Sequence, residues 1–350
     1  MMKKGYLIGL IFILVSCSDS QKKTVAYRKI HGETMGTTYS ITYKDILNKD
    51  FKKEIDQRLI ELNNEVSTYI KTSIISKVNQ AKDSLMISNT HHYFLDNYLK
   101  AKEIYEKTNH YLDVSIMPIV NYWGFGYTEK RKVTKIDSVK IKSLMQDMGL
   151  YKWKLKQGKD SFVIYKPSPT AQLDFSSLAK GYGVDEIGRL LVSKGVNDFV
   201  IDIGGEDLAK GLSPRNSPWN IGISMPKENA AYTDVFSVVE LKNKAIATSG
   251  NYRIFYESNG QKFSHIINPM TGFPERSNLL GASVITDDCM TADAYATAFM
   301  AMGLEKAIQL AEKTKGIEAY LIYVDENGEL KTKFTDGVKK FLLKDDETMK

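Results

Sequence analysis

Cysteine is scarce in this chain of 350 residues, with only Cys17 and Cys289 present. Two cysteines can build neither a zinc cluster nor a disulfide framework. With 43% hydrophobic and 26% charged residues, the composition is that of a globular protein and not of a disordered one. A chain of this length can bury a sizeable core, so it needs no disulfide or structural metal to fold.

The chain also lacks a basic run interleaved with aromatic residues, although its formal net charge is +6. Five lysines precede residue 30, and the later basic residues are interleaved with acidic ones. Proteins that bind nucleic acids gather their basic residues on a patch or stripe. The sequence therefore predicts an ordinary solvated surface and no nucleic-acid partner.

The apolar run Tyr6–Val15 is about half as long as a helix that crosses a bilayer. Behind its two lysines, it is typical of a secretory signal peptide. It ends in Leu-Val-Ser-Cys17, which resembles the lipobox of bacterial lipoproteins, where the cysteine is lipidated. We expect a lipoprotein signal peptide at 1–17, a flexible tether at 18–24, and a lipid anchor on the periplasmic side of a bacterial membrane. A plain signal peptide with an accidental cysteine is the alternative.

Hydrophobic periodicity in the rest of the chain predicts helices and strands without regular βαβ alternation, which favours an α+β fold. Alternating patterns predict a hairpin at 25–43 and strands at 151–156, 161–165, 171–175, 199–203, 317–324 and 329–334. Helical spacing predicts helices at 47–66 behind Asp45, 90–108, 137–148 behind Asp137, 177–194, and 288–315 with a break at Gly303. We expect one globular domain at 25–337 and a loose, charged tail at 338–350.

The stretch Asp174–Asp185 is the first candidate for chemistry. A helix is expected to begin near Ser177, and the free amides at a helix N-terminus bind anions. Lys180 would favour such an anion, and Gly181 and Gly183 would let it approach the backbone. Neither a GxGxxG fingerprint nor a Walker sequence occurs here, which disfavours a Rossmann or P-loop site. A tight helix–sheet contact is the alternative reason for the glycines.

Two further segments offer polar groups. Asp293 and Thr297 are four residues apart, so they share one face of a predicted helix. A carboxylate and a hydroxyl are hard oxygen ligands that suit Mg²⁺ better than zinc. A hydrogen bond between the two side chains at a packing point is the alternative. His265 ends a predicted strand before an Asn-Pro turn, where catalytic groups are common, although a lone histidine is often structural.

These segments resemble, in their order along the chain, the ApbE family of FAD:protein FMN transferases over residues 30–325. The matching motifs are Met35–Tyr39, Ser67–Tyr69, Leu112–Pro118, Trp123–Gly126, Asp174–Asp185, Gly204-Gly205, Ala247–Gly250, His265–Gly272 and Ala292–Ala298. The resemblance implies an ApbE-like flavin transferase fold, with mixed, largely antiparallel sheets and packed helices.

It also implies a Mg²⁺-dependent enzyme that transfers FMN from FAD to a Thr or Ser hydroxyl of an acceptor flavoprotein and releases AMP. Subunits of Nqr- and Rnf-type redox pumps are the implied acceptors. The resemblance assigns FAD binding to Met35, Tyr69, Tyr111, Leu112, Asp113, Asp174, Lys180 and Ile266. It assigns the metal to Ser177, Asp293 and Thr297, and catalysis to His265 and Asp293. An FAD pyrophosphatase and a non-catalytic FAD-binding lipoprotein are the two rival functions.

Overall fold

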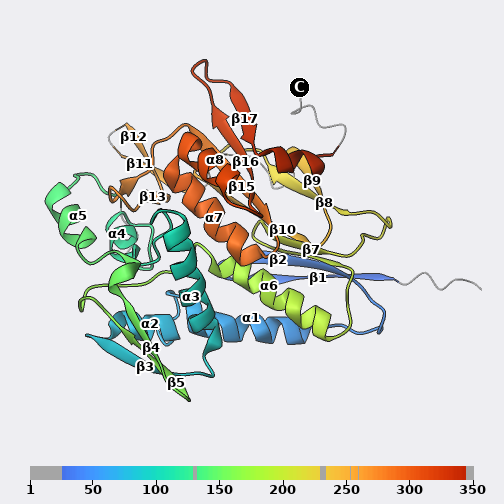
Figure 1. The fold of residues 1–350 in the computed structure, drawn as a ribbon, viewed down its shortest axis with the longest axis horizontal. Helices are drawn as coiled ribbons and strands as arrows, with labels where there is room; N and C mark the ends of the chain where they lie inside the picture. The colour runs from blue at the N-terminus through green and yellow to red at the C-terminus, as the bar shows by residue number, and fades with distance from the viewer. Residues whose placement is uncertain (1–25, 129–131, 229–233, 253, 259, 344–350) are drawn as a thin grey trace, which may run out of the picture.

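The structure, a computed structural model, describes residues 26–128, 132–228, 234–252, 254–258 and 260–343. An eight-stranded sheet forms its centre, and all neighbouring strands in it are antiparallel (Figure 1). In their order across the sheet, the strands are β1 (Tyr27–Thr34), β2 (Thr37–Lys44), β6 (Phe199–Ile203), β7 (Glu206–Lys210), β10 (Lys244–Gly250), β15 (Leu279–Thr286), β16 (Glu318–Val324) and β17 (Leu330–Phe334).

Helices cover one face of this sheet (Figure 1). Those that pack directly on it are α1 (Lys52–Val66), α6 (Ala179–Ser193), α7 (Cys289–Met302) and α8 (Leu304–Lys313), and α3 (His92–Lys107) packs against α1 and α7. The remaining α-helices are α2 (Ile74–Gln80), α4 (Met117–Tyr122) and α5 (Ser138–Met145), and a 3₁₀ helix spans Leu150–Lys152.

The other face is covered by the hairpin of β8 (Trp219–Ser224) and β9 (Val235–Leu241), together with the 3₁₀ helix Asp336–Lys340. Small sheets complete the described elements. They are β3 (Ser84–Ser88), β5 (Ser161–Tyr165) and β4 (Lys154–Gln157); β11 (Phe255–Ser258) and β12 (Gln261–Ser264); and β13 (Ile267–Asn268) and β14 (Phe273–Pro274). The predicted α+β class is confirmed.

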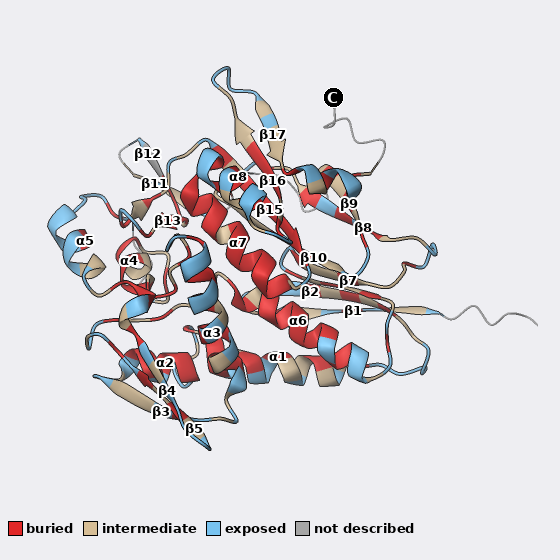
Figure 2. Cartoon of the chain, in the orientation of Figure 1, coloured by how far each residue is buried: buried red, intermediate tan, exposed pale blue. Residues whose placement is uncertain are grey.

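Helix α7 is buried along nearly its whole length (Figure 2). Its alanine-rich sequence has no polar face of the kind that an exposed helix needs. It packs against β10, β15, α3, α6 and α8. Thr297 is its only residue that is not buried, so α7 opens to its surroundings at this one point.

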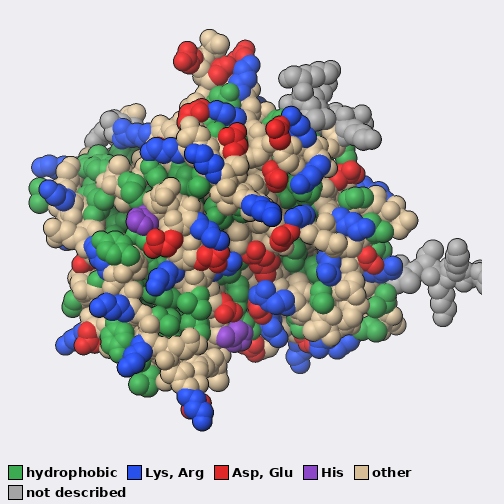
Figure 3. All heavy atoms as spheres, in the orientation of Figure 1, with side chains coloured by type: hydrophobic (Ala, Val, Ile, Leu, Met, Phe, Trp, Pro, Cys, Tyr) green, Lys and Arg blue, Asp and Glu red, His purple; other side chains and the backbone are tan. Residues whose placement is uncertain are grey.

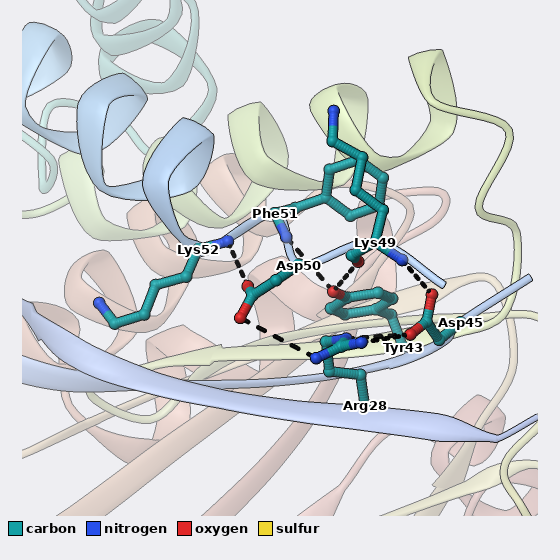
Figure 4. A network of polar contacts seen from close by, with 7 residues as sticks. All are labelled: Arg28, Tyr43, Asp45, Lys49, Asp50, Phe51 and Lys52. Atoms are coloured by element: carbon teal, nitrogen blue, oxygen red, sulfur yellow. Dashed lines mark hydrogen bonds and ion pairs between the residues drawn. The ribbon is translucent and has the colours of Figure 1, made fainter. Parts of the chain in front are cut away.

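Helix α1 begins at Lys52, later than the predicted 47–66, because Asp45 does not cap it (Figure 4). The Asp45 carboxylate accepts hydrogen bonds from the Arg28 guanidinium, at 2.7 Å, and from the Lys49 amide, at 2.9 Å. The Tyr43 hydroxyl lies 3.4 Å from the Phe51 amide, which donates to it. These bonds hold residues 45–51 as a loop between β2 and α1.

Two other sequence predictions need correction, and two short helices were not predicted. Residues 171–175 form no strand apart from an isolated bridge between Ile116 and Gln172. The tail predicted from Val338 starts later, because Val338 and Leu342 are buried against β8 and β9, and Leu343 donates to the Val238 carbonyl at 3.1 Å. The sequence predicted neither α2 nor α4, both of which are short and lack a clear helical period.

The predicted signal peptide, the tether and Cys17 lie outside the described residues, as do residues 344–350. Within the described residues, no helix is both long enough and apolar enough to cross a membrane. On the face drawn in Figure 3, basic and acidic side chains are interspersed.

Candidate functional site

The start of α6 meets α7 at a contact that only glycine permits. The Gly181 amide donates to Asp293 Oδ2 at 3.0 Å. A Cβ on Gly181 would lie 2.3 Å from the Cys289 carbonyl oxygen, a distance that no real contact tolerates. Packing therefore explains this glycine, although the close partner is a helix and not the sheet. No described residue donates to the other oxygen of Asp293.

Lys180 is the second residue of α6, because the helix begins at Ala179 and not at the predicted Ser177. Its Nζ lies 2.5 Å from Oε1 of Glu206, a side chain at the start of β7 that is only 2% exposed. The anion that the sequence predicted beside Lys180 is here a protein carboxylate. The second oxygen of Glu206 is buried and has no hydrogen-bond partner among the described residues.

Negative charge is in excess around this ion pair. Burial disfavours the charged form of Lys180, yet the carboxylates of Asp293 and Glu206 outweigh it and raise the Lys180 pKa. Burial raises the pKa of Glu206, with Asp293 and Asp202 adding to the rise and Lys180 opposing it. Burial likewise raises the pKa of Asp293, against the Lys180 charge and the Gly181 amide.

The side chains of Asp293 and Thr297 each have a partner elsewhere. Thr297 Oγ1 lies 3.3 Å from Ser249 Oγ, at the end of β10, whereas Asp293 accepts from Gly181. The proposed hydrogen bond between Asp293 and Thr297 is not present. Ser177 is half-buried in the turn before α6, and the structure shows no contact that joins it to Asp293 or Thr297. No described group of three or more His, Cys, Asp and Glu side chains has the arrangement of a metal centre.

His265 lies between β12 and β13, and its Nδ1 is 3.1 Å from the Ile254 carbonyl oxygen. A carbonyl only accepts, so Nδ1 carries the proton of this bond and Nε2 of the neutral ring keeps its lone pair. Burial lowers the His265 pKa and the Lys180 charge adds to this effect, whereas the bond to Ile254 opposes it. Burial therefore favours the neutral form of His265, in which Nε2 is the acceptor nitrogen.

Met35 and Gly183 bring the β1–β2 turn against α6. Met35 adopts a positive φ of 51° and is half-buried. A Cβ on Gly183 would lie 3.1 Å from the terminal methyl of Met35, so the second glycine makes room for this side chain. Met35 thus lies on the same helix end as Lys180 and Gly181.

Asp174, Asp113 and Tyr69 form a second group. The Asp174 amide donates to the Val114 carbonyl at 2.7 Å, which joins the two predicted FAD-binding stretches. Asp113 accepts from the Ser115 hydroxyl at 2.6 Å, and burial raises its pKa. Burial and, second to it, the charge of Asp174 raise the Tyr69 pKa, although Tyr69 is 67% exposed.

Comparison with known proteins identifies the family of the chain. A family model described as the ApbE family matches residues 35–321. The chain belongs to the ApbE family. A Haemophilus influenzae protein named FAD:protein FMN transferase is 34% identical over 96% of this chain and 98% of its own length. A Vibrio cholerae protein of the same name is 33% identical over 97% and 100%.

Solved structures of ApbE proteins have the same fold. The flavin transferase ApbE from Vibrio cholerae superposes with a TM-score of 0.79 at 33% identity, covering 91% of this chain and 99% of that one. The apo form of the Pseudomonas stutzeri flavinyl transferase ApbE gives 0.77 at 28% identity, covering 90% and 97%. The predicted family and its ApbE-like fold are therefore confirmed.

The other residues that the ApbE resemblance assigned to FAD differ in what they can contact. Tyr111 accepts a hydrogen bond from Lys306 Nζ at 2.6 Å, at the start of α8. Leu112 and Ile266 are 2% and 6% exposed and belong to the main hydrophobic core.

Sequence reasoning missed Glu206 as a functional side chain. The family resemblance includes the two glycines before it, Gly204-Gly205, but not Glu206 itself. The pairing with Lys180 joins residues 26 positions apart on different elements, and no local pattern predicts it. Glu206 stands between Gly204-Gly205 and Asp207, a sequence typical of an exposed turn, so nothing in the local sequence indicates that this glutamate is buried.

Proposed function

We propose that this chain transfers FMN from FAD to a Thr or Ser hydroxyl of an acceptor protein and that the reaction depends on Mg²⁺. Membership of the ApbE family makes the chain a flavin transferase, an enzyme whose relatives are named FAD:protein FMN transferases. The observation that carries the proposal is the half-used carboxylate of Asp293, buried beside Lys180 and within a helix that opens only at Thr297.

The donor set fits a hard divalent cation. Asp293 has an oxygen without a described partner, Glu206 has a buried orphan oxygen, and Thr297 supplies a hydroxyl. Carboxylate and hydroxyl oxygens are ligands that Mg²⁺ accepts, and it completes its shell with water and substrate phosphates. Asp293 and Thr297 would hold the ion, with Ser177 as the third predicted ligand. When bound, Mg²⁺ acts as a Lewis acid on the phosphate oxygens.

The residues of the chain supply the rest of the reaction. Lys180 and the amide of Ser177, in the turn before α6, hold the pyrophosphate of FAD. His265 Nε2 takes the proton of the acceptor hydroxyl. The hydroxyl oxygen then bonds to the FMN-side phosphorus, and the bond from that phosphorus to the bridging oxygen breaks. AMP leaves with the bridging oxygen, and the acceptor keeps FMN as a phosphoester.

The proposed acceptors are flavin-carrying subunits of Nqr- and Rnf-type redox pumps, and the proposed location is the periplasmic side of a bacterial membrane, through a lipid on Cys17. The lipobox-like Leu-Val-Ser-Cys17 supports this location. Replacement Cys17→Ser should release the protein from the membrane fraction or leave the precursor uncleaved. Unchanged membrane partition together with an unchanged mature mass would refute the anchor.

The test of the function is a transfer assay with three possible outcomes. The purified chain is incubated with FAD, Mg²⁺ and an Nqr-type subunit, and intact mass and AMP are measured. Transfer predicts a mass increase of the subunit by one FMN and an equal amount of AMP. Free FMN and AMP with an unlabelled subunit would support the pyrophosphatase instead. Bound FAD without AMP would support a non-catalytic carrier.

A further inference from the structure

Strand β10 carries two neighbouring hydroxyls on opposite faces of the central sheet. Thr248 Oγ1 lies 2.8 Å from Ser283 Oγ, its neighbour on β15, on the face that bears the β8–β9 hairpin. On the helix face, Ser249 Oγ lies 3.3 Å from Thr297 Oγ1 of α7. Ser249 belongs to the matching motif Ala247–Gly250, but the ApbE resemblance assigns it no role.

The Thr297 hydroxyl bonds to the sheet and not to its own helix. Threonine hydroxyls in helices often donate to the carbonyl one turn earlier. At the C-terminal ends of α3 and α8, Thr108 and Thr314 do so, each at 2.7 Å. For Thr297, Ser249 Oγ is the one hydrogen-bond partner of the hydroxyl among the described residues. The carbonyl of Asp293, one turn earlier in α7, is not used.

Ser249 is held in place by the central sheet. It pairs with Ala282 of β15, two residues after Ala247, which is paired on both sides. Helix α7 packs on both β10 and β15. A side chain on a paired strand is placed more precisely than one on a loop. Ser249 Oγ is therefore a fixed point that can orient the Thr297 hydroxyl.

A hydroxyl that binds a cation needs a second partner for its proton. A threonine hydroxyl has two lone pairs and one proton. When one lone pair faces a cation, the O–H bond points away from it, and a half-buried proton without an acceptor costs free energy. Partners of this kind orient metal ligands throughout proteins. Thr297 is half-buried, and Ser249 Oγ is within reach of its proton.

We propose that Ser249 is a positioning residue, whose Oγ accepts the proton of the Thr297 hydroxyl and so turns a lone pair of Thr297 toward Mg²⁺. This inference rests on the proposed function, because it concerns the metal that this function requires. The O–O distance of 3.3 Å is longer than the usual hydroxyl–hydroxyl distance of about 2.7–2.8 Å. A hydroxyl beside a cation is a stronger donor, so we expect this contact to shorten when the metal binds.

A positioning role fits the geometry better than direct binding of the metal by Ser249. If both hydroxyls gave a lone pair to the same ion, both protons would point away from it. Neither oxygen would then be placed to accept the other proton, and no other described residue accepts that of Thr297. With Ser249 as the acceptor, the Thr297 proton is satisfied within the protein.

Replacement Ser249→Ala tests the inference, and Thr248→Val is the matched control. Each variant removes one hydroxyl of a hydroxyl pair, from adjacent residues of β10, but only Ser249 contacts a predicted metal ligand. The measurement is the unfolding midpoint of the FAD-bound protein as Mg²⁺ is increased. We expect Ser249→Ala to need about 10-fold more Mg²⁺ than the wild type for the same rise, whereas Thr248→Val should need as much as the wild type.

Two further variants show whether Ser249 acts through its hydroxyl and through Thr297. Replacement Ser249→Thr keeps a hydroxyl on the same carbon and should restore a response to Mg²⁺ near that of the wild type. Replacement Thr297→Val removes the proton that Ser249 accepts. In that background, Ser249→Ala should cause no further loss in the response to Mg²⁺, because the two changes remove the same interaction.

The outcomes separate this inference from the proposed function. If the midpoint of the wild type does not respond to Mg²⁺, the Mg²⁺ dependence in the proposed function fails, and the inference fails with it. If the wild type responds and Ser249→Ala responds like Thr248→Val, the positioning role alone is refuted. It is also refuted if Ser249→Thr is impaired as much as Ser249→Ala. A further loss from Ser249→Ala in the Thr297→Val background would show that Ser249 binds the metal itself, which overturns the inference.

Discussion

Two buried carboxylates join α6 to α7 where the helices cross, and they differ in how many of their oxygens accept a hydrogen bond. Asp185 of α6 accepts from the amides of Cys289 and Met290, at 2.8 and 2.9 Å, with one oxygen each. Asp293 of α7 accepts from the Gly181 amide with one oxygen, at 3.0 Å. No described residue donates to its second oxygen.

The difference separates a structural carboxylate from one that can bind a ligand. Asp185 satisfies free amides at the start of α7, which is the work of a helix cap. Burial raises its pKa to about 7, although both amides favour the charged form. Asp293 likewise accepts a helix amide, that of Gly181, but with only one of its two oxygens. It lies beside Lys180, whose partner Glu206 has a buried oxygen without a described hydrogen-bond partner. The same contact therefore both fixes the helices and leaves an oxygen for Mg²⁺.

The largest effect on stability is expected for the structural carboxylate, Asp185. Replacement Asp185→Ala leaves two buried amides without acceptors, at about 1–3 kcal/mol each, so the free energy of unfolding should fall by about 4 kcal/mol. Urea unfolding of this variant and of Asp293→Ala, which strands one amide, gives the comparison. Equal losses in the two variants would show that the carboxylates are used alike.

The ion pair is expected to come next. Replacement Lys180→Met leaves the buried Glu206 without its cation, which costs about 3–5 kcal/mol when that charge persists and less when Glu206 takes up a proton, so we expect about 3 kcal/mol. The double variant Lys180→Met with Glu206→Gln should recover most of this stability but not the affinity for FAD. Because riboflavin lacks the pyrophosphate, its binding should change less. Equal losses for FAD and riboflavin would exclude Lys180 as a phosphate contact.

A smaller loss of stability is expected when a methyl group is added at the contact between α6 and α7. Replacement Gly181→Ala would press its Cβ on the Cys289 carbonyl, and such overpacking costs about 1–3 kcal/mol. Gly183→Ala is the matched control, since its Cβ meets only the side-chain ends of Met35 and Ile203, at 3.1 and 3.6 Å, and the alanine gains helix propensity. Thermal unfolding should separate the two variants. A Gly181→Ala protein as stable as Gly183→Ala would mean that the helices are not closely packed here.

The sequence predicted those parts of the site that depend on local spacing. Asp293 and Thr297 share a face because they are one helical turn apart, and Gly303 ends α7 as expected. The sequence could not predict that Glu206 pairs with Lys180, or that Gly181 serves a helix–helix contact, because both depend on how distant segments pack. Asp45 shows the same limit, since its pattern indicates a cap and the nearby Arg28 binds it instead.

The smallest effect on stability is expected for Asp293→Asn. This variant also tests the assignment of Asp293 as a metal ligand most directly. The amide oxygen can still accept from Gly181, so the free energy of unfolding should change by less than about 1 kcal/mol, while the only charge among the three predicted metal ligands is lost. The measurement is the unfolding midpoint of the FAD-bound protein as Mg²⁺ is increased, for the wild type and for Asp293→Asn. We predict that Mg²⁺ raises the midpoint of the wild type and that Asp293→Asn needs at least about 10-fold more Mg²⁺ for the same rise. An equal response of the two proteins to Mg²⁺ would contradict the assignment of Asp293 as the metal-binding carboxylate.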